Sequence, residues 1–303
     1  MIKSTVCFLI LHYGSSEQTN SAVQSLLSLD GIEECTIVVL DNSSNYEEKD
    51  VGFDKIFVVK AEKNLGFSKG NNLGYSYIKE NIDAKFIIAM NNDIEFPQKD
   101  FILVLQKEYQ KEPFYVAGPD VYSTYKEYHS SPLYLDIPSR EKIEEDIAKL
   151  CERKKYLLNR SMQRKIMGYI KSLLIKPKVD YSKAPDAEGW KTYQSNVVLQ
   201  GSCLIFDRRF IDANEKLFYP ETFLYMEESI LTINCRMNSW NIRYLPTITV
   251  NHLTYFRSSR QFGSYRKYCD RLIARVDMLI DSDRTYLKAY SQYEKSKESS
   301  THE

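Results

Sequence analysis

The first hundred residues alternate between short apolar runs and segments whose apolar residues recur at helical spacing. Apolar runs at 6–11, 35–40, 56–60 and 86–90 predict four strands, and the continuous run at 6–11 is typical of a strand covered on both faces. The segments at 17–29 and 69–81 have the apolar spacing and length of helices. This alternation predicts an α/β fold with a mainly parallel sheet, in which ligands bind at the carboxyl ends of the strands.

The rest of the chain has a different pattern. From about residue 125 to 195 it is polar, rich in Tyr and helical in period, with helices expected at 140–150 and 153–178. Strand patterns return at 197–206 and 242–250, and the charged, Ser-rich tail is expected to fray from about Arg284. We therefore divide the chain into 1–124 and 196–258, which form the two halves of one α/β body, a helical basic insertion at 125–195, and a C-terminal helix and tail at 259–303.

Composition excludes several classes of protein. The 303 residues are 43% hydrophobic and carry 41 Lys and Arg against 41 Asp and Glu, which excludes a disordered chain and a protein that coats polyanions. Six widely spaced Cys contain no C-x-x-C pair, so we expect reduced thiols in a cytoplasmic protein. No apolar run approaches the roughly 20 residues that span a bilayer, which predicts a protein that is soluble or peripheral.

Polar clusters follow three of the predicted strands. Asn91-Asn92-Asp93 comes directly after the fourth strand, where its oxygens could bind a divalent cation or could simply form a turn. Asp41 ends the second strand, where it is either a ligand-binding carboxylate or the first residue of an Asx-turn. The stretch 64–72 has glycines at 66 and 70 that let a backbone approach a ligand ahead of a helix. It matches neither a G-x-G-x-x-G nor a Walker A pattern.

The second half of the chain adds two candidates. Glu227 and Glu228 precede an amphipathic segment, where acids favour a helix N-terminus and where a carboxylate could also act as a general base. His252 follows an apolar strand pattern, so it is either a hydrogen-bonded core residue or part of a site at the strand end.

The order of these pieces is more specific than any one of them. The chain resembles the family 2 inverting glycosyltransferases, especially the rhamnosyltransferase-like branch that builds bacterial surface polysaccharides. The resemblance covers most of residues 5–120 and 196–258, and the stretches that carry it are VCFLILHYG, TIVVLDNSS, EKNLGFSKGNNLG, FIIAMNNDIEF, LQGSCLIFDRRF, FLYMEESIL and IRYLPTITVNH. It implies a GT-A fold, in which a nucleotide-binding half and a smaller acceptor-binding half share one sheet system.

The resemblance also implies roles for residues of the donor site. Asp41 would contact the base or ribose of a nucleoside-diphosphate sugar, and Lys69 would lie near its phosphates. Asn91 and Asp93 would stand for the D-x-D-type motif that binds Mn²⁺ or Mg²⁺, with His252 as a further metal or phosphate contact. The remaining nucleotide-sugar residues would be Asn64 and Asn72, which order the loop over the nucleotide, together with Gly66 and Asn92.

The resemblance implies that Glu228 is the base that deprotonates the acceptor hydroxyl, with Glu227 beside it. The chain departs from the family pattern here, because the usual pair is Glu-Asp. Ile230 and Asn234 replace the second Asp and the Arg that commonly follow the pair, and the N-x-D motif has a single carboxylate. Two alternatives stay open: a non-catalytic protein that binds nucleotide sugars or glycans, and a sugar-nucleotide nucleotidyltransferase.

The basic span 153–178 lies outside the resemblance. It has nine Lys and Arg and no acid, with an apolar stripe at every fourth residue. This pattern suits either a solvated helix packed on the body or a helix drawn to anionic lipid, where a lipid-linked acceptor would lie. We therefore expect a cytoplasmic protein with possible peripheral contact at the inner face of the plasma membrane. A homodimer is possible, and a nucleic acid partner is not expected.

Overall fold

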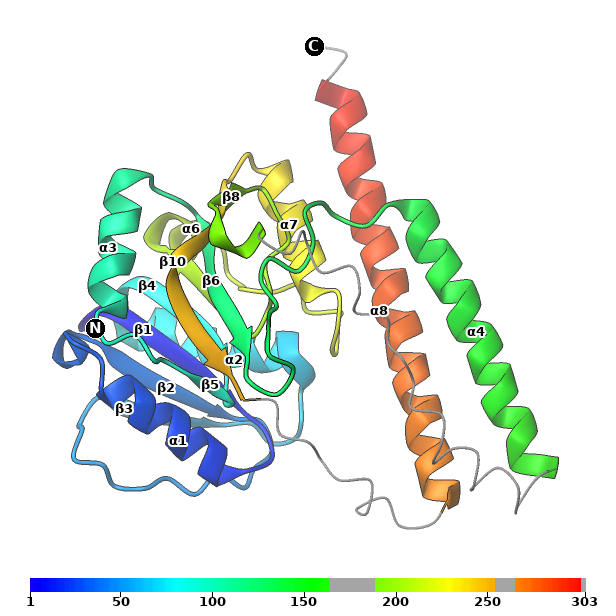
Figure 1. The fold of residues 1–303 in the computed structure, drawn as a ribbon, viewed down its shortest axis with the longest axis horizontal. Helices are drawn as coiled ribbons and strands as arrows, with labels where there is room; N and C mark the ends of the chain where they lie inside the picture. The colour runs from blue at the N-terminus through cyan, green and yellow to red at the C-terminus, as the bar shows by residue number, and fades with distance from the viewer. Residues whose placement is uncertain (164–188, 254–264, 301–303) are drawn as a thin grey trace.

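The computed structural model describes residues 1–163, 189–253 and 265–300 (Figure 1). Within these residues ten strands form one sheet, and the main path runs in the order β3-β2-β1-β4-β9-β6-β10-β5. The strands are β1 (Ile2–His12), β2 (Thr36–Asp41), β3 (Ile56–Lys60), β4 (Ile82–Asn91), β5 (Ile94–Glu95), β6 (Val116–Ser123), β7 (Tyr128–His129), β8 (Gln194–Ser195), β9 (Cys203–Asp207) and β10 (Ile242–His252).

The sheet is mixed. β3, β2, β1 and β4 run parallel, as do β6 and β10, while β9 is antiparallel to both of its neighbours, β4 and β6. The described helices are α1 (Ser16–Leu27), α2 (Gly66–Asn81), α3 (Phe101–Lys111), α4 (Arg140–Gln163), α6 (Arg208–Ala213), α7 (Glu227–Met237) and α8 (Tyr265–Ser300), with short 3₁₀ turns at Ile32–Glu34 and Gly189–Lys191.

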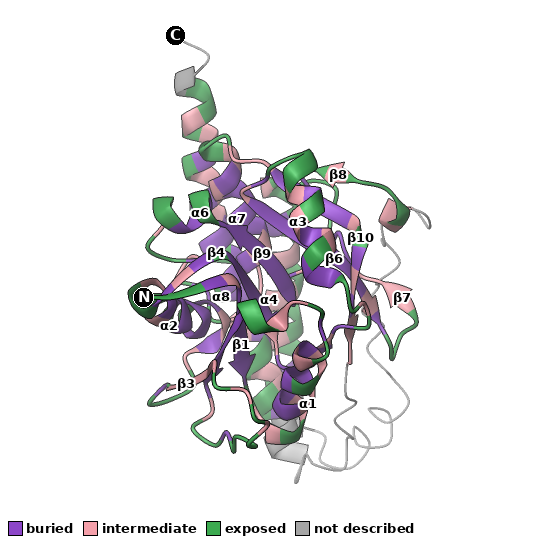
Figure 2. Ribbon diagram, turned by 90° about the vertical axis from the view of Figure 1, so that its left-hand side faces the viewer, coloured by how far each residue is buried: buried purple, intermediate pink, exposed green. Residues whose placement is uncertain are grey.

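The core lies on both faces of the sheet, as the apolar runs predict. Successive residues of a strand point to opposite faces, so Phe8 and Ile10 pack with Leu26 of α1, whereas Leu9 packs with Tyr75 of α2. All five side chains are fully buried, and each such burial contributes about 1.5–3 kcal/mol. Figure 2 shows the strands as the buried centre between helices with exposed outer faces.

The four predicted N-terminal strands are present, and β1 and β4 extend beyond their apolar runs at both ends. The strand predicted at 197–206 was wrong in its first half, because regular pairing starts only at Cys203. Before that point Val198 makes a single bridge to Tyr134. Gly201 and Ser202 form a turn that separates this bridge from β9.

α4 and α8 lie side by side next to the sheet, on the side of α7 (Figure 1). Leu157 of α4 packs with Val276 of α8, and Lys154 pairs with Asp277 at 2.5 Å. The two helices predicted at 140–150 and 153–178 are one continuous helix to Gln163, and the span 164–178 lies outside the described residues. No described helix combines the length and apolar content that crossing a membrane requires.

The expectation of a frayed tail was wrong. α8 continues to Ser300, and Tyr286 is fully buried with its hydroxyl donating to the carbonyl of Pro138. Tyr293 is also buried, and Glu294 pairs with Arg140 of α4. The charged residues that suggested fraying occupy the outer face of the helix, while its Tyr residues pack inward.

The insertion predicted at 125–195 is not purely helical. Its ends contribute β7, which pairs with β6, and β8, which pairs with β10. His129 of β7 stacks on Trp190 and lies 2.8 Å from a carboxylate oxygen of the buried Asp120. These contacts attach both ends of the insertion to the sheet.

Candidate functional site

The polar clusters meet at one edge of the sheet. β1 pairs with β2 so that His12 lies opposite Asp41, and β1 pairs with β4 so that Leu11 lies opposite Asn91. Parallel pairing therefore brings the ends of three strands, separated by up to 79 residues in the sequence, into one row.

A carboxylate and an imidazole face each other at this edge. β5 pairs antiparallel with the end of β10, and the backbone N–H of Leu253 donates to the carbonyl of Asp93. This pairing places Nε2 of His252 3.3 Å from Oδ1 of Asp93. The side chains are 19% and 24% exposed, so both remain open to a ligand.

These residues fit a weakly held cation. Carboxylate and amide oxygens suit Mn²⁺ and Mg²⁺, and Asn91 and Asp93 supply them two residues apart. Among the described residues no group of three or more His, Cys, Asp or Glu side chains could hold a metal ion. The protein thus offers a partial donor set, which leaves coordination positions for oxygens of a bound diphosphate.

The carboxylate of Asp41 binds backbone N–H groups of the loop that follows it. Its carboxylate is 1% exposed and accepts backbone N–H bonds from Ser43, Asn45 and Tyr46 at 3.1–3.4 Å. Burial by itself would raise the pKa of Asp41, but these donors together hold it below the ordinary value. The structure therefore shows an Asx-type turn here, and contact with a nucleoside stays a prediction.

Asn42, which was not among the predicted site residues, organises the loop in front of α2. Its amide Nδ2 donates to Oδ1 of Asn64 and to the carbonyl of Gly66, and its Oδ1 accepts from the N–H of Leu65. Gly66 has a φ of +79°, and a Cβ there would lie 2.3 Å from the carbonyl oxygen of Phe223. Asn64 thus takes part in the hydrogen bonds of this loop, and its role over a nucleotide stays a prediction.

Asn72 connects two segments of the chain, and its predicted role in the nucleotide site stays a prediction. Its amide donates to the carbonyl of Phe218 and accepts from the N–H of the same residue, so it ties α2 to the segment before α7. Asn72 is 8% exposed, whereas Lys69 is exposed on α2.

Glu228 lies close to the end of β4, where the turn with Asn92 and Asp93 begins. Its Oε1 accepts the backbone N–H of Gly201 at 3.2 Å, and the carbonyl of the following residue, Ser202, accepts the N–H of Asn91 at 2.9 Å. Two consecutive residues therefore bridge the carboxylate to the turn after β4. Burial raises the pKa of Glu228 above its ordinary value.

Glu227 is more deeply buried than its neighbour. It is 3% exposed, and its Oε1 has no hydrogen-bond partner among the described residues. Burial, followed by the charge of Glu228, raises the pKa of Glu227 to about 8. Backbone hydrogen bonds lower the pKa of Glu227 only in part, so Glu227 stays neutral near pH 7.

The chain is strained immediately before these acids. Tyr225 and Met226 have φ values of +80° and +67°, which are unusual for residues with side chains. Such a conformation costs on the order of 1 kcal/mol or more at each position and is typical of functional sites. Here it turns the chain so that α7 begins with both acids at its N-terminus.

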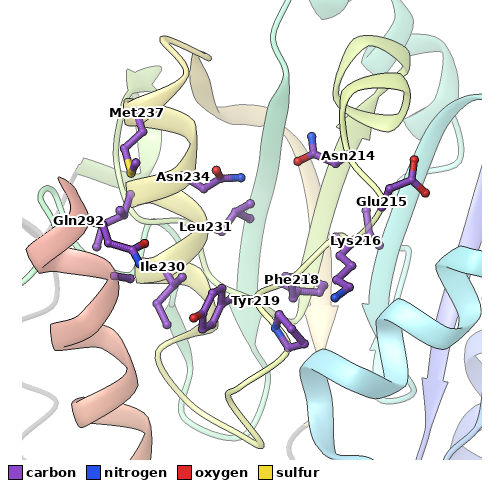
Figure 3. A pocket seen from close by; sticks show the side chains of 14 residues that line it. Asn214, Glu215, Lys216, Phe218, Tyr219, Ile230, Leu231, Asn234, Met237 and Gln292 are labelled. Carbon is purple, nitrogen blue, oxygen red and sulfur yellow. The ribbon is translucent and has the colours of Figure 1, made fainter. Parts of the chain in front are cut away.

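A cavity of about 450 Å³ lies on another face of α7 (Figure 3). Ile230, Ile233 and Met237 line it from α7, together with Tyr219 and with Gln292 of α8. At 100° per residue these α7 side chains form one stripe, and Glu228 points away from it. The cavity is therefore separate from the row of strand ends.

The fold and this site define a class of protein, a GT-A-type α/β protein with an acidic helix start beside the turn at Asn91–Asp93. GalNAc-T7, in a structure with UDP, GalNAc and Mn²⁺, has a similar fold, with a TM-score of 0.52 and 13% identity over 90% of this chain and 47% of that chain. S. aureus TarS 1–349 in complex with UDP-GlcNAc gives a TM-score of 0.49 at 13% identity, over 90% and 66% of the two chains. The first likeness confirms the predicted fold.

The Glycosyl transferase family 2 model matches residues 7–176, more than half of the sequence. The chain therefore belongs to glycosyl transferase family 2. It is also 29% identical over 115 residues to the low-salt glycan biosynthesis hexosyltransferase Agl10 of Haloferax volcanii. That match covers 37% of this chain and only 35% of the relative.

Proposed function

We propose that the protein is an inverting glycosyltransferase that transfers a sugar from a nucleoside-diphosphate sugar to a hydroxyl of a glycan acceptor. The observation that carries this proposal is the bridge through Gly201 and Ser202. It brings a carboxylate suited to accept a proton next to a turn suited to hold a cation and diphosphate. Membership of the family supports the reaction class, and the bridge supports the assignment of residues.

Glu228 is the base in this proposal. Its carboxylate removes the proton of the acceptor hydroxyl as the oxygen forms a bond to the anomeric carbon. The bond from that carbon to the diphosphate breaks at the same time, and its electron pair leaves with the diphosphate. Because attack and departure occur on opposite faces of the sugar, the anomeric configuration inverts. Glu227, neutral beside it, keeps a second negative charge away from the base.

Asn91, Asp93 and His252 would hold Mn²⁺ or Mg²⁺. The cation supplies charge stabilisation for the leaving diphosphate, without proton transfer. The presence of Mn²⁺ with UDP in the structure of GalNAc-T7 makes a divalent ion plausible here. The single carboxylate of the N-x-D motif favours a cation that binds tightly only together with the nucleotide.

The donor in this proposal is a UDP-, dTDP- or GDP-linked sugar, and the UDP in the structure of GalNAc-T7 favours the first. Asp41 and Asn92 lie on its nucleoside and diphosphate sides, and Lys69 lies near the phosphates. We place the protein in the rhamnosyltransferase-like branch, acting on a lipid-linked glycan of bacterial capsule, O-antigen or cell-wall polysaccharide.

A panel of nucleotide sugars tests the donor. Protection against thermal unfolding is measured for UDP-, dTDP- and GDP-sugars with and without Mn²⁺, and the best donor then enters a transfer assay read by NMR at the anomeric proton. We expect one nucleotide class to stabilise the protein with Mn²⁺ and a product of inverted configuration. A product that retains the donor configuration would contradict the proposal, and stabilisation without turnover would favour a binding protein.

The basic span 153–178 is proposed to contact anionic lipid, as a lipid-linked acceptor would require. Of this span the structure describes 153–163, on α4. Co-sedimentation with phosphatidylglycerol vesicles is compared for the native chain and for a variant in which the nine basic residues are Gln. Deletion is less suitable, because Leu157 packs against α8. Equal co-sedimentation would reject the membrane contact.

A further inference from the structure

A chain of buried hydrogen bonds runs behind the strand ends. Nδ2 of Asn92 donates to Oγ1 of Thr19 at 3.0 Å, and this hydroxyl lies 2.6 Å from Nδ1 of His12. On the other side of the ring, Nε2 of His12 lies 3.2 Å from Oδ1 of Asn45. The chain thus joins four elements: the turn after β4, helix α1, the end of β1 and the loop after β2.

Donor and acceptor capacity fix the direction of this chain. Oδ1 of Asn45 can only accept, so Nε2 of His12 carries the proton. In a neutral imidazole Nδ1 then accepts, and the donor is the hydroxyl of Thr19, which itself accepts from Asn92. Burial lowers the pKa of His12, which is fully buried, and favours this neutral form. Every member therefore has a partner in one consistent direction.

The two ends of the chain lie in the two halves of the donor site. Asn92 is the central residue of the cation-binding turn. Asn45 belongs to the loop whose backbone N–H groups hold the carboxylate of Asp41. Asn45 also donates from Nδ2 to the carbonyl of Gly14, which closes the loop onto the end of β1.

We propose that His12 is a positioning residue that couples the cation-binding turn to the nucleoside-side loop. In this role it fixes the distance between the two ends of a nucleoside diphosphate, so that occupation of one end favours occupation of the other. The functional part of the inference rests on the proposed donor site. The mechanical coupling between the two loops does not depend on it.

A purely structural role for His12 makes a different prediction. The imidazole packs on Tyr46 with ring centroids 5.0 Å apart, so its loss would also lower stability. Loss of stability alone would reduce the folded fraction without changing the donor KM of the folded enzyme. Loss of positioning removes binding that is equal in ground and transition states, which raises KM with little change in kcat.

The first test measures donor KM, kcat per folded enzyme and the Mn²⁺ concentration for half activation. His12→Leu breaks the chain at the ring, and Thr19→Val breaks it in α1 at nearly constant volume. For both variants we expect KM and the Mn²⁺ requirement to rise together, by about fivefold for one lost hydrogen bond, with kcat changed less than twofold. His129→Leu, which removes an imidazole stacked on Trp190, is the matched control and should leave both quantities unchanged.

Two conservative variants sharpen this test. His12→Asn keeps a polar atom near the position of Nδ1, and His12→Gln keeps one near Nε2, so each restores one link of the chain. We expect both to give KM values between those of the native protein and His12→Leu. A lower unfolding temperature in His12→Leu and Thr19→Val, with unchanged KM and Mn²⁺ requirement, would overturn the proposal.

The second test needs no nucleotide. Urea unfolding midpoints of Asn45→Ala, Asn92→Ala and the double variant are measured in the native protein and in His12→Leu. If His12 couples the two loops, the midpoint shifts of Asn45→Ala and Asn92→Ala should not add up in the double variant of the native protein. In His12→Leu the same two shifts should be additive. Additive shifts in both would overturn the proposal. If the native protein binds no nucleotide, the proposed function fails, and this cycle still decides whether the loops are coupled.

Discussion

The backbone N–H of Gly201 donates to Oε1 of Glu228, and a Cβ at residue 201 would lie 2.3 Å from that same oxygen. The carboxylate thus occupies the space that any other residue at this position would fill. Glycine here serves a close approach between a loop and a functional group. The motif LQGSCLIF contains this glycine, but only the tertiary structure shows what it contacts.

Gly201→Ala should therefore displace the carboxylate of Glu228 and lower transferase activity by 10-fold or more, since a shift of about 1 Å at a reacting group can cost 100-fold. Steady-state kcat is the measurement. Gly118→Ala is the control, because its methyl group would meet the end of the Leu199 side chain, at 3.0 Å, and no carboxylate. Equal activity of the two variants would contradict the close-approach argument.

Glu228→Gln should lower kcat by about 10²–10⁴-fold, because the amide cannot accept the proton of the acceptor hydroxyl. Donor binding, measured by thermal protection, should persist. Glu228→Asp restores the usual Glu-Asp pair and should retain more activity than Glu228→Gln. Full activity of Glu228→Gln would remove this residue as the base.

Glu228 should make kcat depend on pH. The base must be ionised to accept a proton, and the pKa of Glu228 is raised by burial. The kcat should therefore rise with pH through that raised pKa, with a midpoint above the ordinary range of a glutamate. A pH profile of kcat for the native protein and Glu227→Gln should show the rise in both, and a flat profile would exclude titration of the base.

Glu227 makes a separate prediction for stability. Its pKa is about 8 in the folded protein, against an ordinary value of 4.5. Between these two values the folded state binds more protons than the unfolded chain, so this contribution to stability is complete below pH 4.5 and is lost as the pH rises through 8. The glutamine of Glu227→Gln cannot ionise, so the unfolding temperature of this variant should rise relative to that of the native protein between pH 5 and pH 8. Parallel curves would place the pKa of Glu227 near its ordinary value.

Asp93→Asn should raise the Mn²⁺ concentration for half activation by 10-fold or more, because it removes the one carboxylate of the turn. His252→Asn should act in the same direction, since Nε2 of His252 lies 3.3 Å from Oδ1 of Asp93. Isothermal titration with Mn²⁺ in the presence of nucleotide provides a readout besides activity. If neither variant changes this requirement, the cation site lies elsewhere.

The end of α8 should be necessary for stability. Tyr286→Phe removes the hydrogen bond to the carbonyl of Pro138 and should cost about 1 kcal/mol. Tyr286→Ala also empties a fully buried site and should cost about 3–5 kcal/mol. Urea unfolding measures both, with Lys288→Ala on the exposed face as the control. Little loss in Tyr286→Ala would restore the expectation of a frayed tail.

The sequence by itself determined the α/β body and the ends of its strands. The apolar runs of β1, β2 and β4 are buried on both faces, whereas the edge strand β3 is only partly buried. The polar residues that end these strands meet because parallel strands share one carboxyl edge. The residue pattern was less informative for α8. Its many charged residues suggested a frayed tail, although they lie on the outer face and Tyr286 and Tyr293 are buried. The pattern also failed at 197–202, where a turn interrupts an otherwise apolar run.

Tertiary structure alone decided which groups of the site are in contact. The contact of Gly201 with Glu228 joins residues 27 positions apart, and that of His12 with Asn45 joins residues 33 apart. The sequence left open whether Asp41 binds a ligand or forms an Asx-turn, and it could not show that Asn72 ties α2 to Phe218. Spacing predicts which residues share an element, whereas hydrogen bonds between elements depend on how the strands and helices are packed together.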